Sequence, residues 1–130
     1  MSTRGHVGIK NEDGTVSFKY NHYDSYFDGV GEILQNHFNS EEKAKKLIAD
    51  GDAIYTICKN EELEKASSEE EYLKIMNEDV FIEFSYLWKD GQWYGAASSM
   101  FNDKFNKFQP LKEILEKLEE LKDAEEYLEI

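Results

Sequence analysis

The 130-residue chain has a single cysteine, a single proline and far fewer basic than acidic side chains. With only Cys58, the chain cannot form an internal disulfide, and such sparse cysteine usage is typical of a reducing compartment. Lys and Arg number 15 against 28 Asp and Glu, which leaves a net charge of −13. So acidic a chain lacks the basic surface that direct nucleic-acid binding or docking on anionic lipid requires.

Long apolar runs and targeting signals are also missing. No run approaches the ~20 residues of a membrane-spanning helix, and no signal-peptide core follows Met1 to Gly5. We therefore expect a cytoplasmic protein with no membrane contact. Aromatic residues make up 14 % of the chain, which is too many for a wholly disordered protein. A chain of this length can bury a core in one domain without disulfide or metal staples.

Two β-hairpins are predicted from the alternation of apolar and polar residues. The alternation lies on both sides of the Asp-Gly dipeptides at 13–14 and 90–91, which favour tight turns. We expect hairpins over residues 5–21 and 79–100. Residues 53–58, Ala-Ile-Tyr-Thr-Ile-Cys, are rich in β-forming side chains and predict a short central strand.

Helical spacing predicts two short helices over residues 28–51, one over 68–77 and a long amphipathic one over 110–128. Ser68 and Glu71 have the spacing of a capping box at the third of these helices. The apolar stripe of the last helix comprises Leu111, Ile114, Leu118, Leu121 and Leu128. We expect this stripe to dock on the sheet. A dimer seam is the alternative, so the protein is either a monomer or a homodimer.

These elements together predict an α+β fold in a single domain, residues 1–130. We expect an antiparallel sheet built from the two hairpins and the central strand, with the helices packed on one face. Small residues around Gly95 dominate the returning strand of the second hairpin. They predict either a closely packed helix over this strand or another close approach to its backbone.

The densest group of functional side chains follows the first hairpin and comprises His22, Tyr23, Asp24 and Tyr26. One hypothesis is a small-ligand or nucleotide site, in which rings stack on bases and the amides near Gly29 and Gly31 bind phosphate. The alternative is a structural loop in which Asp24 accepts backbone amides. A metal or general-base role for His22 and Asp24 is a third hypothesis, but it lacks the three ligands of a catalytic zinc site.

Motifs of catalysis are otherwise missing. The chain has no Gly-x-Ser-x-Gly elbow, no complete dinucleotide fingerprint and no full calcium loop. We therefore predict a non-enzymatic protein with no catalytic residues, no metal and no cofactor.

Carboxylates concentrate in two segments, residues 61–71 and 113–129. The candidate partner-binding residues are Glu61, Glu62, Glu64, Glu69, Glu70, Glu113, Glu116, Glu120 and Glu126. These acidic faces are either solvated surface or an imitation of a phosphate backbone that occupies a basic groove of a partner. Electrostatic steering would make such binding fast and sensitive to salt.

Several motifs in residues 2–52 occur in a fixed order. They are Ser2-Thr3-Arg4-Gly5-His6-Val7-Gly8-Ile9, Asn11-Glu12-Asp13-Gly14, Tyr20-Asn21-His22-Tyr23-Asp24-Ser25-Tyr26, Gly29-Val30-Gly31 and His37-Phe38. This order resembles a family of small phage and prophage proteins, whose third motif reads Tyr-Cys-His-Trp-Asp-Gly-Tyr-Pro. In this chain His22, Asp24 and Tyr26 match that loop, whereas Asn21 stands in place of its cysteine.

The resemblance implies a phage or mobile-element origin. Small acidic phage proteins often act in the host cytoplasm by binding and blocking host machinery. We therefore expect an anti-CRISPR-like or other anti-defence inhibitor whose partner is a host protein or defence complex with a basic groove. The alternative is a small-ligand or nucleotide-binding protein, a signal sponge, that uses the loop around His22, Asp24 and Tyr26.

Overall fold

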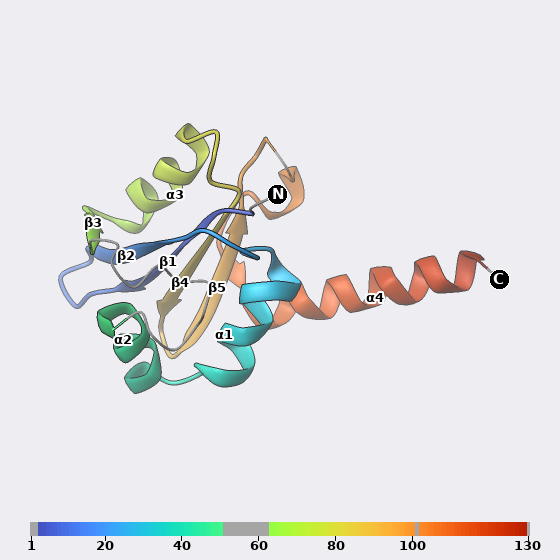
Figure 1. The fold of residues 1–130 in the computed structure, drawn as a ribbon, viewed down its shortest axis with the longest axis horizontal. Helices are drawn as coiled ribbons and strands as arrows, with labels where there is room; N and C mark the ends of the chain where they lie inside the picture. The colour runs from blue at the N-terminus through green and yellow to red at the C-terminus, as the bar shows by residue number, and fades with distance from the viewer. Residues whose placement is uncertain (1–2, 51–62, 101, 130) are drawn as a thin grey trace.

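The computed structural model describes residues 3–50, 63–100 and 102–129, which form a six-stranded sheet flanked by helices (Figure 1). The strands are β1 (Gly5–Lys10), β2 (Val16–Asn21), β3 (Glu64–Ala66), β4 (Phe84–Lys89), β5 (Gln92–Ala97) and β6 (Gln109–Pro110). The helices are α1 (Glu32–His37), α2 (Glu41–Asp50), α3 (Glu69–Glu78) and α4 (Leu111–Glu129), with short helical turns η1 (Phe27–Gly31) and η2 (Asp103–Phe105). The α+β class is confirmed. None of the described helices has the length and apolar composition needed to cross a bilayer.

Both predicted hairpins form, but the second is shorter than the predicted 79–100, because β4 begins at Phe84 and β5 ends at Ala97. Strands β1 and β2 pair antiparallel and join through Gly14, which has φ of 87°. Strands β4 and β5 join through Asp90 and Gly91, with φ of 50° and 78°. In this second turn both central residues have positive φ, which is the signature of the tight turn that matches the twist of two hairpin strands.

The sheet is mixed, so the prediction of an antiparallel sheet is wrong. Its strand order is β3-β2-β1-β4-β5-β6, and β1 pairs parallel with β4, which places His6 opposite Ser85. Alternation within a hairpin predicts its own pairing but does not indicate how two hairpins join. The predicted central strand, residues 53–58, lies outside the described residues. The edge strands β3 and β6, of three and two residues, are too short to show alternation.

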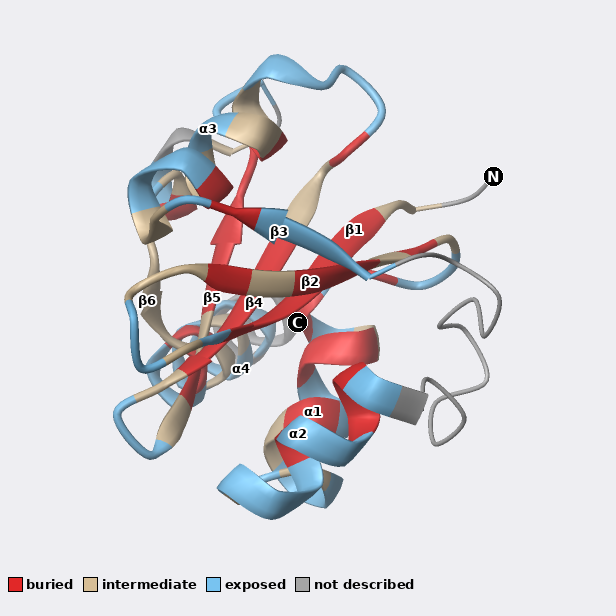
Figure 2. Ribbon diagram, turned by 90° about the vertical axis from the view of Figure 1, so that its left-hand side faces the viewer, coloured by how far each residue is buried: buried red, intermediate tan, exposed pale blue. Residues whose placement is uncertain are grey.

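Helices cover both faces of the sheet, so the prediction of helices on one face is also wrong. Helices α1, α2 and α4 share one apolar cluster with Val7, Tyr86 and Trp93. Helix α3 covers the opposite face, where Tyr72 and Met76 are fully buried. Strands β1 and β4 are consequently buried on both sides (Figure 2).

Helix α4 docks on the sheet through its first turns. Leu111 and Ile114 are fully buried, and their Cδ1 atoms would each lie 3.4 Å from a Cβ added at Gly95. Gly95 therefore allows the close approach of a helix that the small residues of β5 predicted. The rest of α4 extends away from the sheet (Figure 1), and Leu121 is 53 % exposed.

The N-terminus of α3 is capped as its sequence predicts. The Ser68 hydroxyl accepts a hydrogen bond from the Glu71 amide at 3.1 Å. The Glu71 carboxylate accepts from the backbone amide of Ser67 at 2.6 Å and from the Ser67 hydroxyl. The capping box is thus shifted by one residue, from the Ser68 amide to that of Ser67. These hydrogen bonds hold the pKa of Glu71 below its usual value.

Candidate functional site

The loop of residues 22–26 connects β2 to η1 at one end of the sheet. The Tyr26 hydroxyl donates to Asp24 Oδ1 at 3.3 Å, and the charge of Asp24 raises the pKa of Tyr26. The Tyr20 hydroxyl and His22 Nδ1 are 2.6 Å apart, and the rings of His22 and Tyr23 meet edge to face. The structure thus brings Asp24 and Tyr26 together, while His22 bonds with the preceding strand.

Buried polar groups attach this loop to the sheet. The Asn21 side-chain amide donates to the Tyr23 carbonyl at 2.8 Å and to Ser25 Oγ at 2.5 Å. The Tyr86 hydroxyl donates to the Ser25 carbonyl at 2.6 Å. Asn21 is fully buried and holds the loop through these hydrogen bonds. These contacts support a structural role for the loop.

The amides proposed for phosphate binding are engaged within the chain. The N–H groups of Gly29 and Gly31 both point to the Tyr26 carbonyl, at 3.0 and 3.4 Å. A Cβ at Gly29 would lie 2.5 Å from the Asp24 carbonyl oxygen, and one at Gly31 would lie 3.2 Å from the Tyr86 hydroxyl. Close packing therefore explains both glycines, and neither amide is directed at a ligand.

No metal centre is formed by the residues that the structure describes. Among them, no group of three His, Cys, Asp or Glu side chains lies close enough to hold an ion. Within residues 3–50, 63–100 and 102–129, His22 and Asp24 thus have no third side chain with which to hold a metal ion.

The two acidic segments lie on opposite faces of the sheet and do not form one surface. The start of α3 lies over the central strands, where Glu69 contacts Lys10 of β1 and Lys89 of β4, whereas α4 packs on the opposite face beside β5 and β6. Glu64, in the edge strand β3, and Glu70 are exposed. Glu61 and Glu62 lie outside the described residues, as does the side chain of Glu126. One basic groove facing one side of the sheet would not contact both segments.

Glu69 is neutralised by lysines and is not a free acidic contact. Its carboxylate bonds with Lys89 Nζ at 2.6 Å and with Lys10 Nζ at 3.3 Å. Partial burial raises the pKa of Glu69, but the two lysines outweigh it and hold the pKa below its usual value.

The exposed carboxylates of α4 form a stripe. Glu113, Glu116 and Glu120 are exposed and follow the i, i+3, i+7 spacing. At about 100° per residue, this spacing places them within about 60° of one another, opposite Leu111. Within the described part of the chain, no cation pairs with any of the three. Lys122, on the inner side, pairs instead with Asp28 at 3.5 Å.

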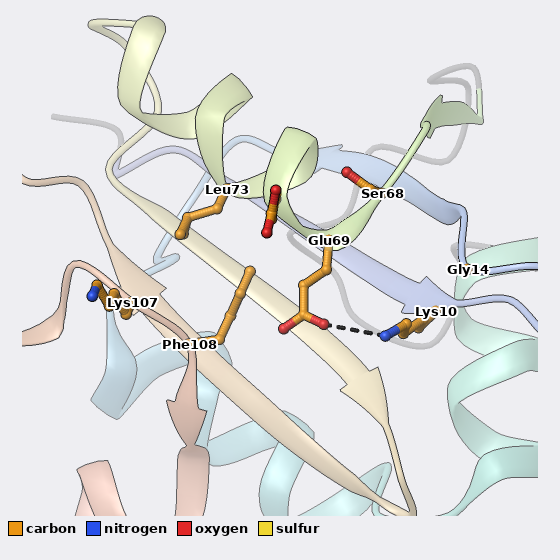
Figure 3. Close-up of a pocket in the computed structure, with 8 residues that line it drawn as sticks. Lys10, Gly14, Ser68, Glu69, Leu73, Lys107 and Phe108 are labelled. Carbon is orange, nitrogen blue, oxygen red and sulfur yellow. Dashed lines mark hydrogen bonds and ion pairs between the residues drawn. The ribbon is translucent and has the colours of Figure 1, made fainter.

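A hollow of about 680 Å³ lies between α3 and the segment that precedes β6 (Figure 3). It is lined by Lys10, Gly14, Ser68, Glu69, Glu70, Leu73, Lys107 and Phe108. Of these residues, the sequence predicts only Glu69 and Glu70 as candidate site residues. The lining comes from three distant segments, so no local motif marks it.

Comparison of the chain with protein-family models, with curated proteins and with solved structures finds no match in any of the three.

Proposed function

We propose that this protein is a non-enzymatic binding protein that docks on a basic groove of a partner protein through the outer face of α4. The observation that carries the proposal is the stripe of Glu113, Glu116 and Glu120, three exposed carboxylates without cationic partners in the described structure. They lie on a helix whose distal part extends away from the sheet (Figure 1). A projecting helix can enter a groove that the body of the molecule could not reach.

The charge of the whole chain favours a basic partner. A net charge of −13 steers the protein toward positive surfaces and makes association faster at low salt. A groove that binds nucleic acid has this character, because phosphate contacts require lysine and arginine. Carboxylates on α4 would occupy such a groove in place of phosphates.

The resemblance of residues 2–52 to phage proteins favours a host target. On this proposal the protein inhibits a defence or nucleic-acid-processing complex in the host cytoplasm, in the manner of an anti-CRISPR protein. The carboxylates of α4 exclude nucleic acid from the groove, so inhibition requires no catalytic residue.

Charge reversal on α4 tests the proposal. The tagged protein is incubated with host lysate at low and high salt, and bound proteins are identified by mass spectrometry. We expect a basic, nucleic-acid-binding protein at low salt that is lost at high salt. The triple variant Glu113→Lys, Glu116→Lys, Glu120→Lys should no longer capture it and should remain folded, since all three side chains are exposed.

A matched variant separates a site from net charge. Glu12→Lys, Glu42→Lys, Glu78→Lys changes the charge equally at exposed positions outside α4 and outside the candidate acidic residues, and should retain the partner. Equal loss in both triple variants would show that only net charge matters. Unchanged capture by the α4 variant would refute docking through this helix.

A further inference from the structure

The hollow between α3 and the segment before β6 has the size of a small-molecule site. Its volume of about 680 Å³ lies within the range of roughly 300–1,000 Å³ that is usual for ligand pockets. Figure 3 shows its lining: Leu73 and Phe108 form one side, and Glu69 and Lys10 form the other. Neither the loop of residues 22–26 nor the stripe on α4 contributes to it.

Aromatic packing fixes the apolar side of the hollow. The ring of Phe108 stacks on that of Tyr72 with 5.8 Å between centroids and 10° between planes. Tyr72 is fully buried, and its hydroxyl donates to the Tyr86 carbonyl at 2.8 Å. Phe108 is therefore a half-buried ring held in place by the core, and such a ring suits stacking against a planar ligand.

Lysines give the hollow a local charge unlike that of the whole molecule. Glu69 lies between Lys10 and Lys89, so its negative charge is more than balanced. Lys89 Nζ also lies 4.6 Å from the ring centroid of Tyr94, and this contact helps to hold the Lys89 ammonium in place. Lys107 is exposed and forms no ion pair within the described structure. Glu70 is the one lining carboxylate without a lysine partner there.

We infer that this hollow binds a small planar aromatic molecule that bears one negatively charged group, such as a carboxylate, sulfonate or phosphate. The aromatic part packs against Phe108 and Leu73, and the anionic group accepts from Lys107 at one side or Lys10 at the other. Glu70 disfavours a second negative charge on the ligand. The inference is independent of docking through α4, which lies on the opposite face of the sheet.

Amide chemical shifts of the ¹⁵N-labelled protein test the site with two matched probes. 2-Naphthalenesulfonate carries the expected anion, and 2-naphthylmethylammonium carries a cation on the same ring system. We expect the sulfonate to shift the amides of Gly14, Leu73 and Phe108 in a saturable way. The ammonium compound should shift them much less, since it meets Lys107 and Lys10. Equal binding of both probes, or saturable shifts elsewhere only, would overturn the inference.

Variants of the lining assign the two halves of the ligand. Lys107→Glu should weaken sulfonate binding about five-fold, as expected for a part-exposed ion contact. Lys117→Glu, the same change on exposed α4, should leave it unchanged. Leu73→Gln should weaken binding of the aromatic part without disturbing the stack of Phe108 on Tyr72. Glu70→Gln should strengthen sulfonate binding, because it removes a nearby negative charge. If both Lys107→Glu and Lys10→Gln bind the sulfonate as tightly as the unmodified protein does, the anion subsite is refuted.

Discussion

His6 is a titratable side chain inside the core beneath α3. It is 5 % exposed, and its ring contacts those of Phe18 and Tyr72, with centroids 4.8 and 6.3 Å away. Burial lowers the pKa of His6 from 6.5 to about 4, against a smaller opposing effect of the Asp79 charge. Its Nδ1 atom is buried without a hydrogen-bond partner in the structure. Sequence alternation placed His6 in a strand but did not indicate which face would be covered.

The pKa of His6 predicts acid sensitivity above the range of the carboxylates. Unfolded His6 takes up a proton below pH 6.5, whereas native His6 does so only near pH 4, so stability is lost as pH falls between these values. From pH 6.5 to pH 5 this amounts to about 1.5 kcal/mol, since the loss approaches about 1.4 kcal/mol per pH unit only below pH 6.5. Urea unfolding at both pH values measures it.

The variant His6→Phe should lack this loss. At pH 7 its free energy of unfolding should lie within about 1 kcal/mol of that of the unmodified protein, because one buried ring replaces another of similar size. His37→Gln, at an exposed position in α1, is the control and should retain the acid sensitivity. An unchanged pH dependence in His6→Phe would assign the effect to other groups. Glu69 and Glu71 have pKa values below the ordinary 4.5, so their contributions are lost only at lower pH.

Among the elements, α4 has two parts with different surroundings. Leu111 and Ile114 are fully buried against the sheet, Leu115 and Leu118 are half-buried, and Leu121 is 53 % exposed. The apolar stripe of α4 is continuous in the sequence, but only its first residues pack against the sheet. The pair of Lys122 and Asp28 connects the middle of the helix to η1.

Two truncations of the stripe of α4 should differ in cost. Ile114→Ala should lower the free energy of unfolding by about 2–4 kcal/mol, since it removes fully buried methyl groups. Leu121→Ala should change it by about 0.5 kcal/mol or less, as is usual at exposed positions. Urea denaturation followed by circular dichroism compares them. Similar costs at both positions would mean that the helix is docked or detached along its whole length.

At the scale of the molecule, one sheet carries a core on each face. The clusters around Leu34 and around Met76 are separated by β1 and β4, which are buried on both sides (Figure 2). Shared central strands should couple the two clusters, so that neither face unfolds alone.

This coupling predicts one cooperative transition for variants on either face. Leu34→Ala and Met76→Ala should each cost about 2–4 kcal/mol, because both side chains are fully buried. Trp88 and Trp93 belong to the cluster of Leu34, so their fluorescence monitors that face. In Met76→Ala, fluorescence and far-ultraviolet circular dichroism should have the same urea midpoint. Separate midpoints would contradict coupling between the faces.

Prediction from sequence was most successful where structure depends on near neighbours. The Asp-Gly turns, the cap of α3 at Ser68 and the small residues facing α4 follow from local patterns. Of the loop candidates, Asp24 and Tyr26 lie together, whereas His22 bonds with Tyr20 of the preceding strand. Their partners were not predicted: Asn21 and Tyr86 hold the loop from within the core.

The sequence by itself determined the α+β class, both hairpins, the helices and the acidic charge, since periodicity, turn residues and caps act over a few residues. Only the tertiary structure decided that β1 lies parallel to β4 and that helices cover both faces of the sheet. It also separated the two acidic segments and brought Lys10, Leu73 and Phe108 around one hollow. Such arrangements depend on packing between segments far apart in the chain, which no local pattern encodes.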